Sequence, residues 1–383
     1  MKRLLERLSK GEKRLPNQTE ERKASHIKIC LEEDVQARRK TTGFEDVLLV
    51  HRAIPEINRE KISLSTAVFN HKLSAPVIVG AMTGGGAETT KINASIAQAV
   101  EELGLGMGVG SQRAAIDNPE LERTFTVTRE KAPTAFLIAN IGAPQLAREY
   151  GVKEARKAVE MMEADALAIH LNPLQETIQP EGETDYTGVL EKISKISQAI
   201  DVPVIVKETG AGIAAEEAKL LEEAGVAGID VAGAGGTSWA AVEYYRAKRG
   251  KDGFRQMLGE HFWDWGIPTA ASLIEVVQSV HLTVIASGGI RSGVDVAKAL
   301  VVGADLASPA LPVLRPATEN PKEVERRLQF MIEELKNTMF LVGTDSVQKL
   351  KNASAVVTGR TAEWLRLRNF RLELYARRKA GAS

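Results

Sequence analysis

Short apolar runs alternate with longer amphipathic stretches along most of this chain, from about residue 77 onward. Short β-branched runs are typical of buried parallel strands, and apolar residues spaced three to four positions apart are typical of helices. We predict strands at 77–81, 106–110, 136–140, 166–171, 203–207, 228–232, 283–287 and 305–308. Eight strands, each followed by a helical stretch, predict an α/β protein with a closed TIM (β/α)8 barrel.

Two of the intervening stretches have clear apolar faces, which we expect to pack on the barrel. The first consists of Ile92, Ile96, Val100 and Leu103. The second consists of Val324, Leu328, Met331, Ile332, Leu335 and Met339.

The pattern divides the single predicted domain of residues 1–383 into three parts. Residues 1–76 form an N-terminal cap, 77–340 the barrel, and 341–383 a C-terminal extension that ends in a frayed basic tail. Within the cap we expect a charged helix at about 18–40 and then an extended segment in which Ile62, Leu64 and Ala67 face one way.

One connection, residues 233–282 after the sixth predicted strand, is far longer than a typical loop between strand and helix. It contains Tyr244, Tyr245, Trp263 and Trp265. Because long loops on a rigid scaffold often carry function or an interface, we expect a lid or a subunit contact here, and a homo-oligomer.

Composition excludes several classes of function. Lys plus Arg and Asp plus Glu both number 50, so the formal net charge is zero and no global field attracts nucleic acid or an anionic membrane. Cys30 is the one cysteine, which excludes an internal disulfide, and its predicted helical setting favours an incidental thiol. Without a long apolar segment, we expect a cytoplasmic protein with a small-molecule substrate.

The residues after the predicted strands are polar and rich in glycine, and in a parallel barrel these positions form the active site. In Met82–Gly86, the glycines let the backbone approach a flat ligand closely, and Thr83 offers a hydroxyl. Gly233–Ser238 and Ser287–Arg291 expose backbone N–H groups that suit a phosphate. Arg113, after the second strand, adds a permanent cation. The upstream turn with Arg22, Lys23 and His26 is a weaker candidate for a second anion clamp. We therefore predict two sites for phosphorylated groups, as a flavin nucleotide and an anionic substrate would need.

Two further segments point to chemistry. The fourth strand is followed by the segment His170–Glu176, and a cluster of imidazole, amide and carboxylate at a barrel mouth is rarely structural. Lys207 ends the fifth strand, where an inward ammonium needs an anionic partner. Two roles fit Lys207: a cation that stabilises a cofactor, or a Schiff-base nucleophile.

Ordered motifs across nearly the whole chain resemble the FMN-dependent type 2 isopentenyl diphosphate isomerases. They are RKxxH at 22–26, MTGG at 82–85, SQR at 111–113, HLNPLQE at 170–176, Lys207, GAGGTSW at 233–239 and SGGIR at 287–291. Ala232 departs from the serine of many relatives, and Thr209 and Ala211 lie in a KExGxG stretch, which puts one FMN hydrogen bond in doubt.

The resemblance implies that reduced FMN is the acid and base that converts isopentenyl to dimethylallyl diphosphate, with NADPH as reductant. FMN would contact Ala81, Met82, Thr83, Ser111, Asn140, Lys207, Thr237, Gly288, Gly289, Ile290, Ala310 and Leu311. Substrate would contact Arg22, Lys23, His26, Ser111, Gln112, Arg113 and Gln175. The resemblance also implies Gln175, His170 and Asn172 as catalytic residues and Glu176 as the Mg2+ ligand.

Three other functions fit the sequence less well. An FMN-dependent 2-hydroxy-acid oxidase needs a His base late in the barrel, and no His occurs in residues 287–312. A nucleotide dehydrogenase of the inosinate type needs a loop cysteine, whereas Cys30 precedes the barrel. A noncatalytic flavin- or phosphate-binding protein does not require Gln175 and Glu176.

Overall fold

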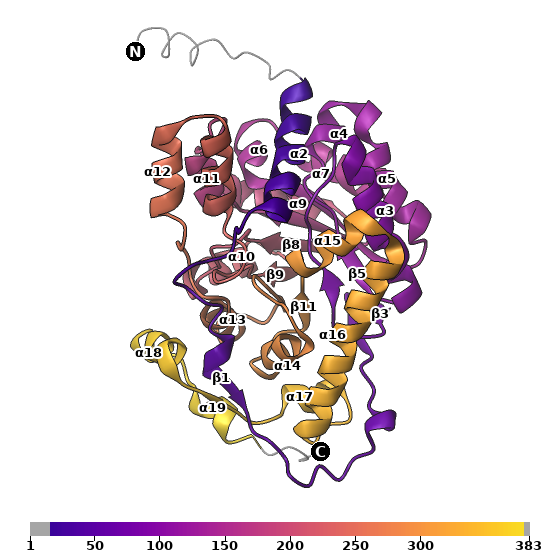
Figure 1. The fold of residues 1–383 in the computed structure, drawn as a ribbon, viewed down its shortest axis with the longest axis vertical. Coiled ribbons are helices and arrows are strands. Elements are labelled where there is room, and N and C mark those ends of the chain that lie inside the picture. Colours follow the sequence, from indigo (N-terminus) through magenta and orange to yellow (C-terminus); the bar gives the residue numbers. More distant parts are fainter. Residues whose placement is uncertain (1–15, 379–383) are drawn as a thin grey trace.

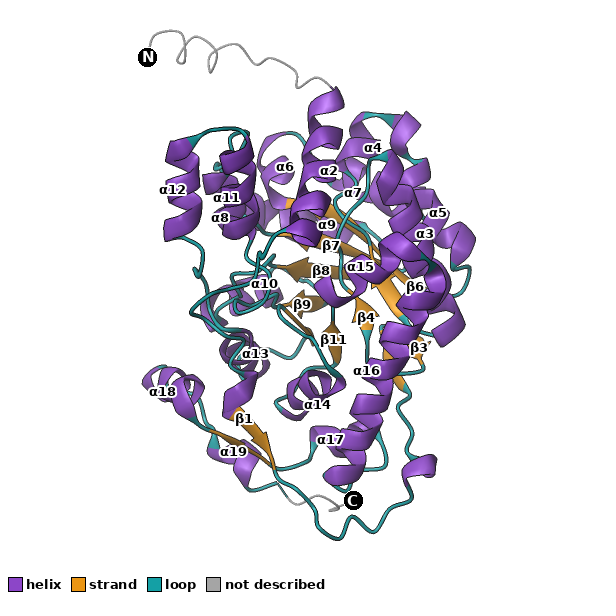
Figure 2. Ribbon diagram, viewed as in Figure 1, coloured by secondary structure: helices purple, strands orange, loops and turns teal. Residues whose placement is uncertain are grey.

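The computed structural model describes residues 16–378, and its core is an eight-stranded parallel sheet. The strands are β4 (Ile78–Val79), β5 (Gly106–Gly108), β6 (Phe136–Gly142), β7 (Ala166–His170), β8 (Val204–Lys207), β9 (Gly228–Asp230), β10 (Thr283–Ser287) and β11 (Leu306–Ser308). They neighbour one another in chain order. Each lies at a predicted position, and Figure 2 shows them at the centre of a ring of helices.

The sheet closes on itself. β11 contacts β4, Val77 and Ala307 form a parallel bridge, and the Ala307 amide donates to the Pro76 carbonyl at 2.9 Å. Closure removes both exposed edges of the sheet. The predicted (β/α)8 barrel is therefore confirmed.

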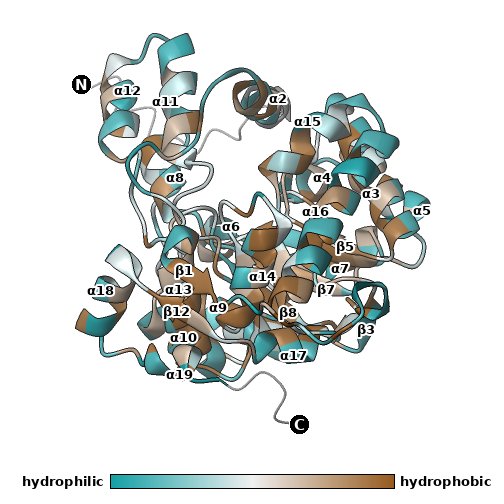
Figure 3. Cartoon of the chain, turned by 60° about the horizontal axis from the view of Figure 1, so that its bottom comes forward, coloured by the Kyte–Doolittle hydropathy of each residue, from teal (hydrophilic) through white to brown (hydrophobic). Residues whose placement is uncertain are grey.

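The outer helices bury the apolar faces that the sequence predicts. They are α3 (Ala87–Leu103), α5 (Arg123–Lys131), α7 (Val152–Met161), α9 (Val189–Ala199), α10 (Ala215–Glu223), α13 (Thr269–Val277), α14 (Gly293–Val301) and α16 (Pro321–Leu341). Ile92, Ile96 and Val100 of α3 are buried in the main core cluster. Helices α13 and α14 are buried along most of their length and are largely hydrophobic in Figure 3.

Further short helices lie in the connections that follow the strands: α4 (Arg113–Asp117), α6 (Ala143–Arg148), α8 (Pro173–Ile178), α11 (Trp239–Arg249), α12 (Gly253–His261) and α15 (Leu311–Glu319). The segment 233–282 is thus not a loop, because α11 and α12 pack on each other before α13 begins. Trp263 is buried in this packing, whereas Trp265 is 60% exposed.

Helix α2 (Pro16–Glu32) lies among the helices at one end of the barrel and contacts α11, α15 and α4 (Figure 1). It ends eight residues before the predicted limit at residue 40. The reason is tertiary, because the chain leaves the helix and Gln36 forms an antiparallel bridge with Thr237. The basic segment 1–15 lies outside the described residues.

A β-hairpin with a two-residue turn covers the end of the barrel opposite to α2. Strands β2 (Thr66–Val68) and β3 (His71–Leu73) pair around Phe69 and Asn70, both of which have positive φ, as a type I′ turn requires. Val68 and Leu73 pack on barrel-lining residues such as Phe136. The expectation that Ala67 shares a face with Ile62 and Leu64 was wrong, because Ala67 is exposed and Val68 is buried instead.

The C-terminal segment packs against the start of the chain. β12 (Ala355–Val357) pairs with β1 (Val47–Leu49), and α17 (Val347–Lys351), α18 (Gly359–Leu367) and α19 (Glu373–Ala376) flank it. Short 3-10 turns occur at Phe44–Asp46, Arg59–Lys61 and Pro119–Leu121. The predicted frayed tail was wrong as far as residue 378, because Tyr375 is buried. Residues 379–383 lie outside the described part.

Replacing Arg368 by alanine should destabilise the packing of the C-terminal segment on α13. Its guanidinium donates from Nε to Oε1 of Glu275 at 2.7 Å, and Glu275 is fully buried on α13. Arg368→Ala leaves that carboxylate without its cation, so we expect the free energy of unfolding to fall by about 3 kcal/mol. Chemical denaturation measures it, with the exposed Arg366→Ala as control. Equal stability of the two variants would contradict this role.

Candidate functional site

A polar cavity of about 250 Å³ lies at the carboxyl ends of the barrel strands, with α2 along one side. Its lining comes from α2 and from the segments after the strands. The predicted residues that line it are Arg22, Lys23, His26, Ala81, Met82, Thr83, Ser111, Arg113, Asn140, His170, Asn172, Gln175, Glu176, Lys207, Thr237, Gly288, Gly289, Ala310 and Leu311. Residues separated by almost 300 positions therefore share one cavity.

Two predicted residues are placed differently. The Gln112 side chain is fully buried outside the cavity, where its Nε2 donates to the Ala158 carbonyl and its Oε1 accepts from the Asn140 amide, both at 2.8 Å. It therefore holds β6 in place and does not face a ligand, which corrects the expected substrate contact. The Ile290 side chain belongs to the core and does not line the cavity either.

Cations gather where α2 meets the loop after β5. Lys23 donates from Nζ to the Ser111 carbonyl at 2.8 Å. Burial, and then the neighbouring Arg22 and Arg113, lower the pKa of Lys23 to about 7. Burial also lowers the pKa of Arg22, partly offset by Glu181. Like charges crowded in a buried place favour an anionic ligand that would relieve them.

Carboxylate and amide groups face these cations from α8. Glu176 accepts from Asn172 Nδ2 at 2.8 Å and from the Glu183 amide at 2.6 Å, so both of its oxygens are oriented. The buried Glu183 carboxylate in turn pairs with Arg113 at 3.3 Å. Within residues 16–378, no three His, Cys, Asp or Glu side chains are grouped to hold a metal. A cation here would thus use Glu176 with ligand or water oxygens, as Mg2+ commonly does.

Glu243, which sequence reasoning missed, connects α2 to α8. It is 1% exposed on α11, and its Oε1 lies 2.9 Å from His26 Nε2 and 3.2 Å from Gln175 Nε2. Burial on its own would raise its pKa, but His26 and Arg246 lower the pKa of Glu243 to about 2. A possible signal was its position four residues after Trp239, on the same helical face.

The floor of the cavity holds a neutral imidazole beside a cation. Nδ1 of His170 lies 2.8 Å from Oδ1 of Asn140. Burial, and then Lys207, lower the pKa of His170 to about 3, so the ring is neutral near pH 7 and a poor proton donor. Burial raises the pKa of Asp230, against the effect of Lys207. Asp230 also accepts a hydrogen bond from Ser287 Oγ.

The segments after β9, β10 and β11 form a second anion-binding region. Gly288 and Gly289 have φ of +92° and +74°, and a Cβ on Gly236 would lie 2.3 Å from the Gly289 nitrogen, so side chains are excluded here. Nη2 of Arg291 is buried without a partner among the described residues, as is Oγ of Ser308. Exposed backbone and an unsatisfied guanidinium fit the phosphate of a nucleotide such as FMN.

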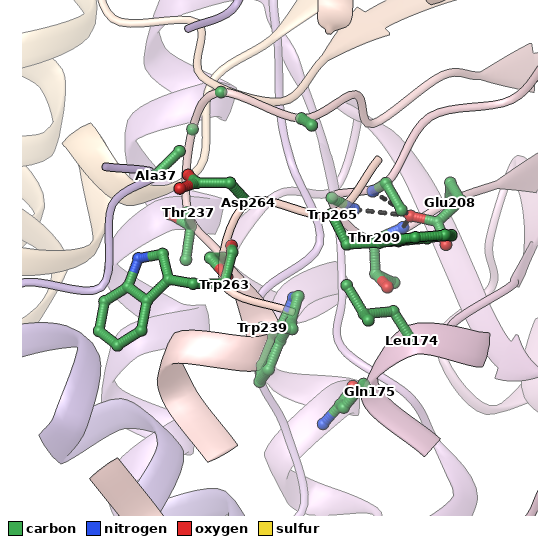
Figure 4. Close-up of a pocket in the computed structure, with 16 residues that line it drawn as sticks. Ala37, Leu174, Gln175, Glu208, Thr209, Thr237, Trp239, Trp263, Asp264 and Trp265 are labelled. Carbon is green, nitrogen blue, oxygen red and sulfur yellow. Dashed lines mark hydrogen bonds between the residues drawn. The ribbon is translucent and has the colours of Figure 1, made fainter. Parts of the chain in front are cut away.

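A second, small cavity of about 10 Å³ is lined by Trp239, Trp263 and Trp265 among others (Figure 4). Gln175 and Trp239 line both cavities. Trp239 also stands edge-on to His26, with ring centroids 5.2 Å apart. Burial raises the pKa of Glu208 in this cavity to about 7, although the amides of residues 209–211 oppose it. The cavity has room for about one water molecule. Trp239 gives the polar site an apolar wall.

Comparison with known proteins shows the family of the chain. The chain matches the FMN-dependent dehydrogenase family over residues 15–118 and 120–357. It is 54% identical over 358 residues to the isopentenyl-diphosphate delta-isomerase of Methanothermobacter thermautotrophicus, covering 94% of this chain and 99% of the relative. The corresponding protein of Methanosarcina barkeri is 53% identical, with 94% and 97% covered.

Among solved structures, a lactate oxidase of Pediococcus acidilactici matches with a TM-score of 0.61 and 19% identity, over 90% of this chain and 93% of the oxidase. At that identity the likeness concerns the fold alone. Fold and site together define an FMN-dependent (β/α)8-barrel protein. Within that class, the chain belongs to the type 2 isopentenyl-diphosphate delta-isomerase family.

Proposed function

We propose that this protein converts isopentenyl diphosphate to dimethylallyl diphosphate, with reduced FMN, with NADPH as the reductant and with Mg2+ on the diphosphate. The observation that carries the proposal is one cavity lined by two groups of residues that fit anions, together with Gln175 and Glu176. One region surrounds Lys23 and the other surrounds Arg291. The names of the relatives support the same reaction.

The residues that line the cavity fit both FMN and a substrate diphosphate with Mg2+. FMN would lie with its phosphate at Gly288, Gly289 and Arg291, and the Lys207 ammonium would face its ring. The substrate diphosphate would lie against Arg22, Lys23 and Arg113 together with the Mg2+ that Glu176 holds. When bound, reduced FMN supplies the acid and base of the 1,3 proton shift, and Mg2+ neutralises diphosphate charge.

The remaining side chains orient the substrate and exclude water. Gln175 is fixed by Glu243, so its amide holds one position beside the substrate carbons. His170 is neutral and held by Asn140, so it can accept or donate one hydrogen bond without transferring charge. The indole of Trp239 would cover the apolar end. The proton transfers are therefore assigned to the cofactor, because none of these three side chains is a strong acid.

We expect Lys207→Ala to release reduced FMN at least about tenfold more readily than the unchanged protein. The ammonium would stabilise negative charge on the reduced ring, and a charge-assisted hydrogen bond contributes about 1.5–3 kcal/mol. Anaerobic ultrafiltration followed by flavin absorbance measures retention, and Lys219→Ala on α10 is the control. Unchanged retention and activity would remove this assignment.

Anaerobic turnover in D2O tests the proposed function. Purified protein receives FMN, Mg2+, isopentenyl diphosphate and either NADPH or dithionite, and NMR follows product and deuterium. We expect dimethylallyl diphosphate to form only when the flavin is reduced, and we expect the product to contain deuterium. If the diphosphate stays unchanged while a 2-hydroxy acid reduces the bound FMN, the oxidase reading replaces this one.

Diphosphate binding should weaken as the pH rises above 7. Lys23 has a pKa of about 7 in the free protein, so above that pH it must take up a proton to pair with an anion. We expect up to tenfold loss of affinity per pH unit between 7 and 9 from this group. Calorimetry of inorganic pyrophosphate binding at several pH values measures this loss. The Lys23→Arg variant is the control, because its guanidinium stays charged and should lose this part of the pH dependence. Identical pH profiles would contradict the assignment.

A further inference from the structure

The segment that follows α8 folds back on that helix. The Gly182 amide donates to the Gln179 carbonyl at 3.1 Å, and the Glu183 amide donates to Oε2 of Glu176 at 2.6 Å. Gly182 has no room for a side chain, because an added Cβ would lie 1.7 Å from the Glu176 carbonyl oxygen. Only glycine allows the two main chains to approach so closely. A main-chain donor is thereby fixed against the carboxylate that we assign to Mg2+.

The Glu183 side chain anchors this segment. It is buried, and its Oε1 accepts from Arg113 Nη2 at 3.3 Å and from Arg148 Nη1 at 3.2 Å. Its Oε2 accepts from Gln145 Nε2 at 3.3 Å. Arg113 begins α4, whereas Gln145 and Arg148 belong to α6. The carboxylate therefore connects the segment after α8 to two helices from other parts of the barrel.

Glu183 can act on a ligand only through the groups that it holds. Within residues 16–378, it is not among the residues that line the main cavity, whereas Arg113, Gln145 and Glu176 are. Groups that orient a metal ligand from behind typically contribute about 10–100-fold to metal affinity. The charge of Glu183 acts in the same direction, because a buried carboxylate near a cation site adds attraction for Mg2+.

We propose that Glu183 is a positioning residue for Mg2+, because its main-chain amide holds Glu176 while its carboxylate holds Arg113. The metal ligand and a cation of the diphosphate site then keep a fixed relation to each other. The proposal rests on the proposed function, because it uses the Mg2+ and the diphosphate of that site. Each of these two ligands should bind more tightly in the presence of the other, and Glu183 should carry part of that coupling.

A carboxylate that competed with the diphosphate for Arg113 would have the opposite effect. A guanidinium has five N–H donors, so Arg113 can donate to Glu183 from Nη2 and to a diphosphate at the same time. The diphosphate therefore does not need to displace Glu183. Removal of the Glu183 charge distinguishes the two roles: it weakens Mg2+-dependent binding if Glu183 positions, and it tightens that binding if Glu183 competes.

Calorimetry of inorganic pyrophosphate binding to the holoprotein with oxidised FMN tests the proposal without turnover. Affinity is measured with EDTA and at saturating Mg2+, and the ratio of the two affinities is the coupling. Glu183→Gln should reduce this ratio at least about tenfold. Asp185→Asn, on the exposed part of the same segment, is the matched control and should keep the ratio. An unchanged ratio in Glu183→Gln, or tighter binding with Mg2+ present, would overturn the proposal.

A second variant separates position from charge. Gly182→Ala keeps the Glu183 carboxylate, but its Cβ displaces the segment from Glu176. It should also reduce the ratio at least about tenfold, whereas the exposed Gly253→Ala, whose Cβ meets no atom within 4 Å, should not. If Glu183→Gln loses flavin or fails to fold, Gly182→Ala decides. A reduced ratio in Glu183→Gln together with an unchanged ratio in Gly182→Ala would mean that long-range charge acts, and positioning would be wrong.

The unchanged protein distinguishes failure of this proposal from failure of the proposed function. If pyrophosphate does not bind to it, or binds with equal affinity with and without Mg2+, the assignment of the diphosphate and its Mg2+ is wrong, and the role of Glu183 is wrong with it. If Mg2+ tightens binding to the unchanged protein and equally to both variants, the role of Glu183 alone is wrong.

Discussion

Replacing Glu176 by glutamine should lower kcat/KM for isopentenyl diphosphate at least about a thousandfold, which corresponds to about 4 kcal/mol. Glutamine keeps the shape of the side chain, and its one amide oxygen can still accept from either Asn172 Nδ2 or the Glu183 amide. It removes the charged oxygen that we assign to Mg2+. The cation and the diphosphate would then bind poorly together.

Initial rates across a Mg2+ series measure this effect, because the variant should need far more Mg2+ and still not reach the original rate. Flavin content should stay unchanged and Tm should fall only slightly, since one of the two hydrogen bonds that residue 176 accepts is lost. Glu191→Gln on the exposed side of α9 is the matched control and should behave like the unchanged protein. An unaltered Mg2+ requirement in Glu176→Gln would mean that the metal ligand lies elsewhere.

Replacing Glu243 by alanine should lower kcat about a hundredfold with little change in flavin content. Its carboxylate orients His26 and Gln175 together and also accepts from Arg246 Nη1 at 3.0 Å. Without it Gln175 loses a fixed position, and buried charges lose a partner. Steady-state kinetics of Glu243→Ala measure the loss, and Glu243→Gln should be less impaired because an acceptor oxygen remains.

A double-mutant cycle distinguishes positioning from general damage. If Glu243 acts through Gln175, the double variant Glu243→Ala/Gln175→Ala should be no slower than Gln175→Ala alone. Two independent, additive losses would show that Glu243 does not work through this amide. The remote and equally buried Glu275 provides a comparison, because Glu275→Gln should lower Tm without changing kcat of the folded enzyme.

Much of the site could be predicted because it lies next to regular structure. Each barrel strand is a short apolar run, so the next polar residue in the chain is placed at the same end of the barrel. Thr83, His170 and Lys207 follow this rule, and all three line the cavity. Gln112 does not, because a residue beside a strand end can also turn into the packing between strand and helix. Local pattern does not distinguish the two directions.

The sequence by itself determined the eight-stranded barrel, the glycine-rich segments that leave room for a phosphate, and the order of the polar residues. These follow from local periodicity and backbone freedom, which depend on neighbouring residues in the chain. Only the tertiary structure decided that α11 and α12 replace the expected long loop, and that Glu243 meets His26 across 217 residues. It also decided that Arg22 and Cys30 of α2 line the same cavity as the residues after the barrel strands. Contacts between distant segments depend on how whole helices pack, and no pattern within one segment contains that information.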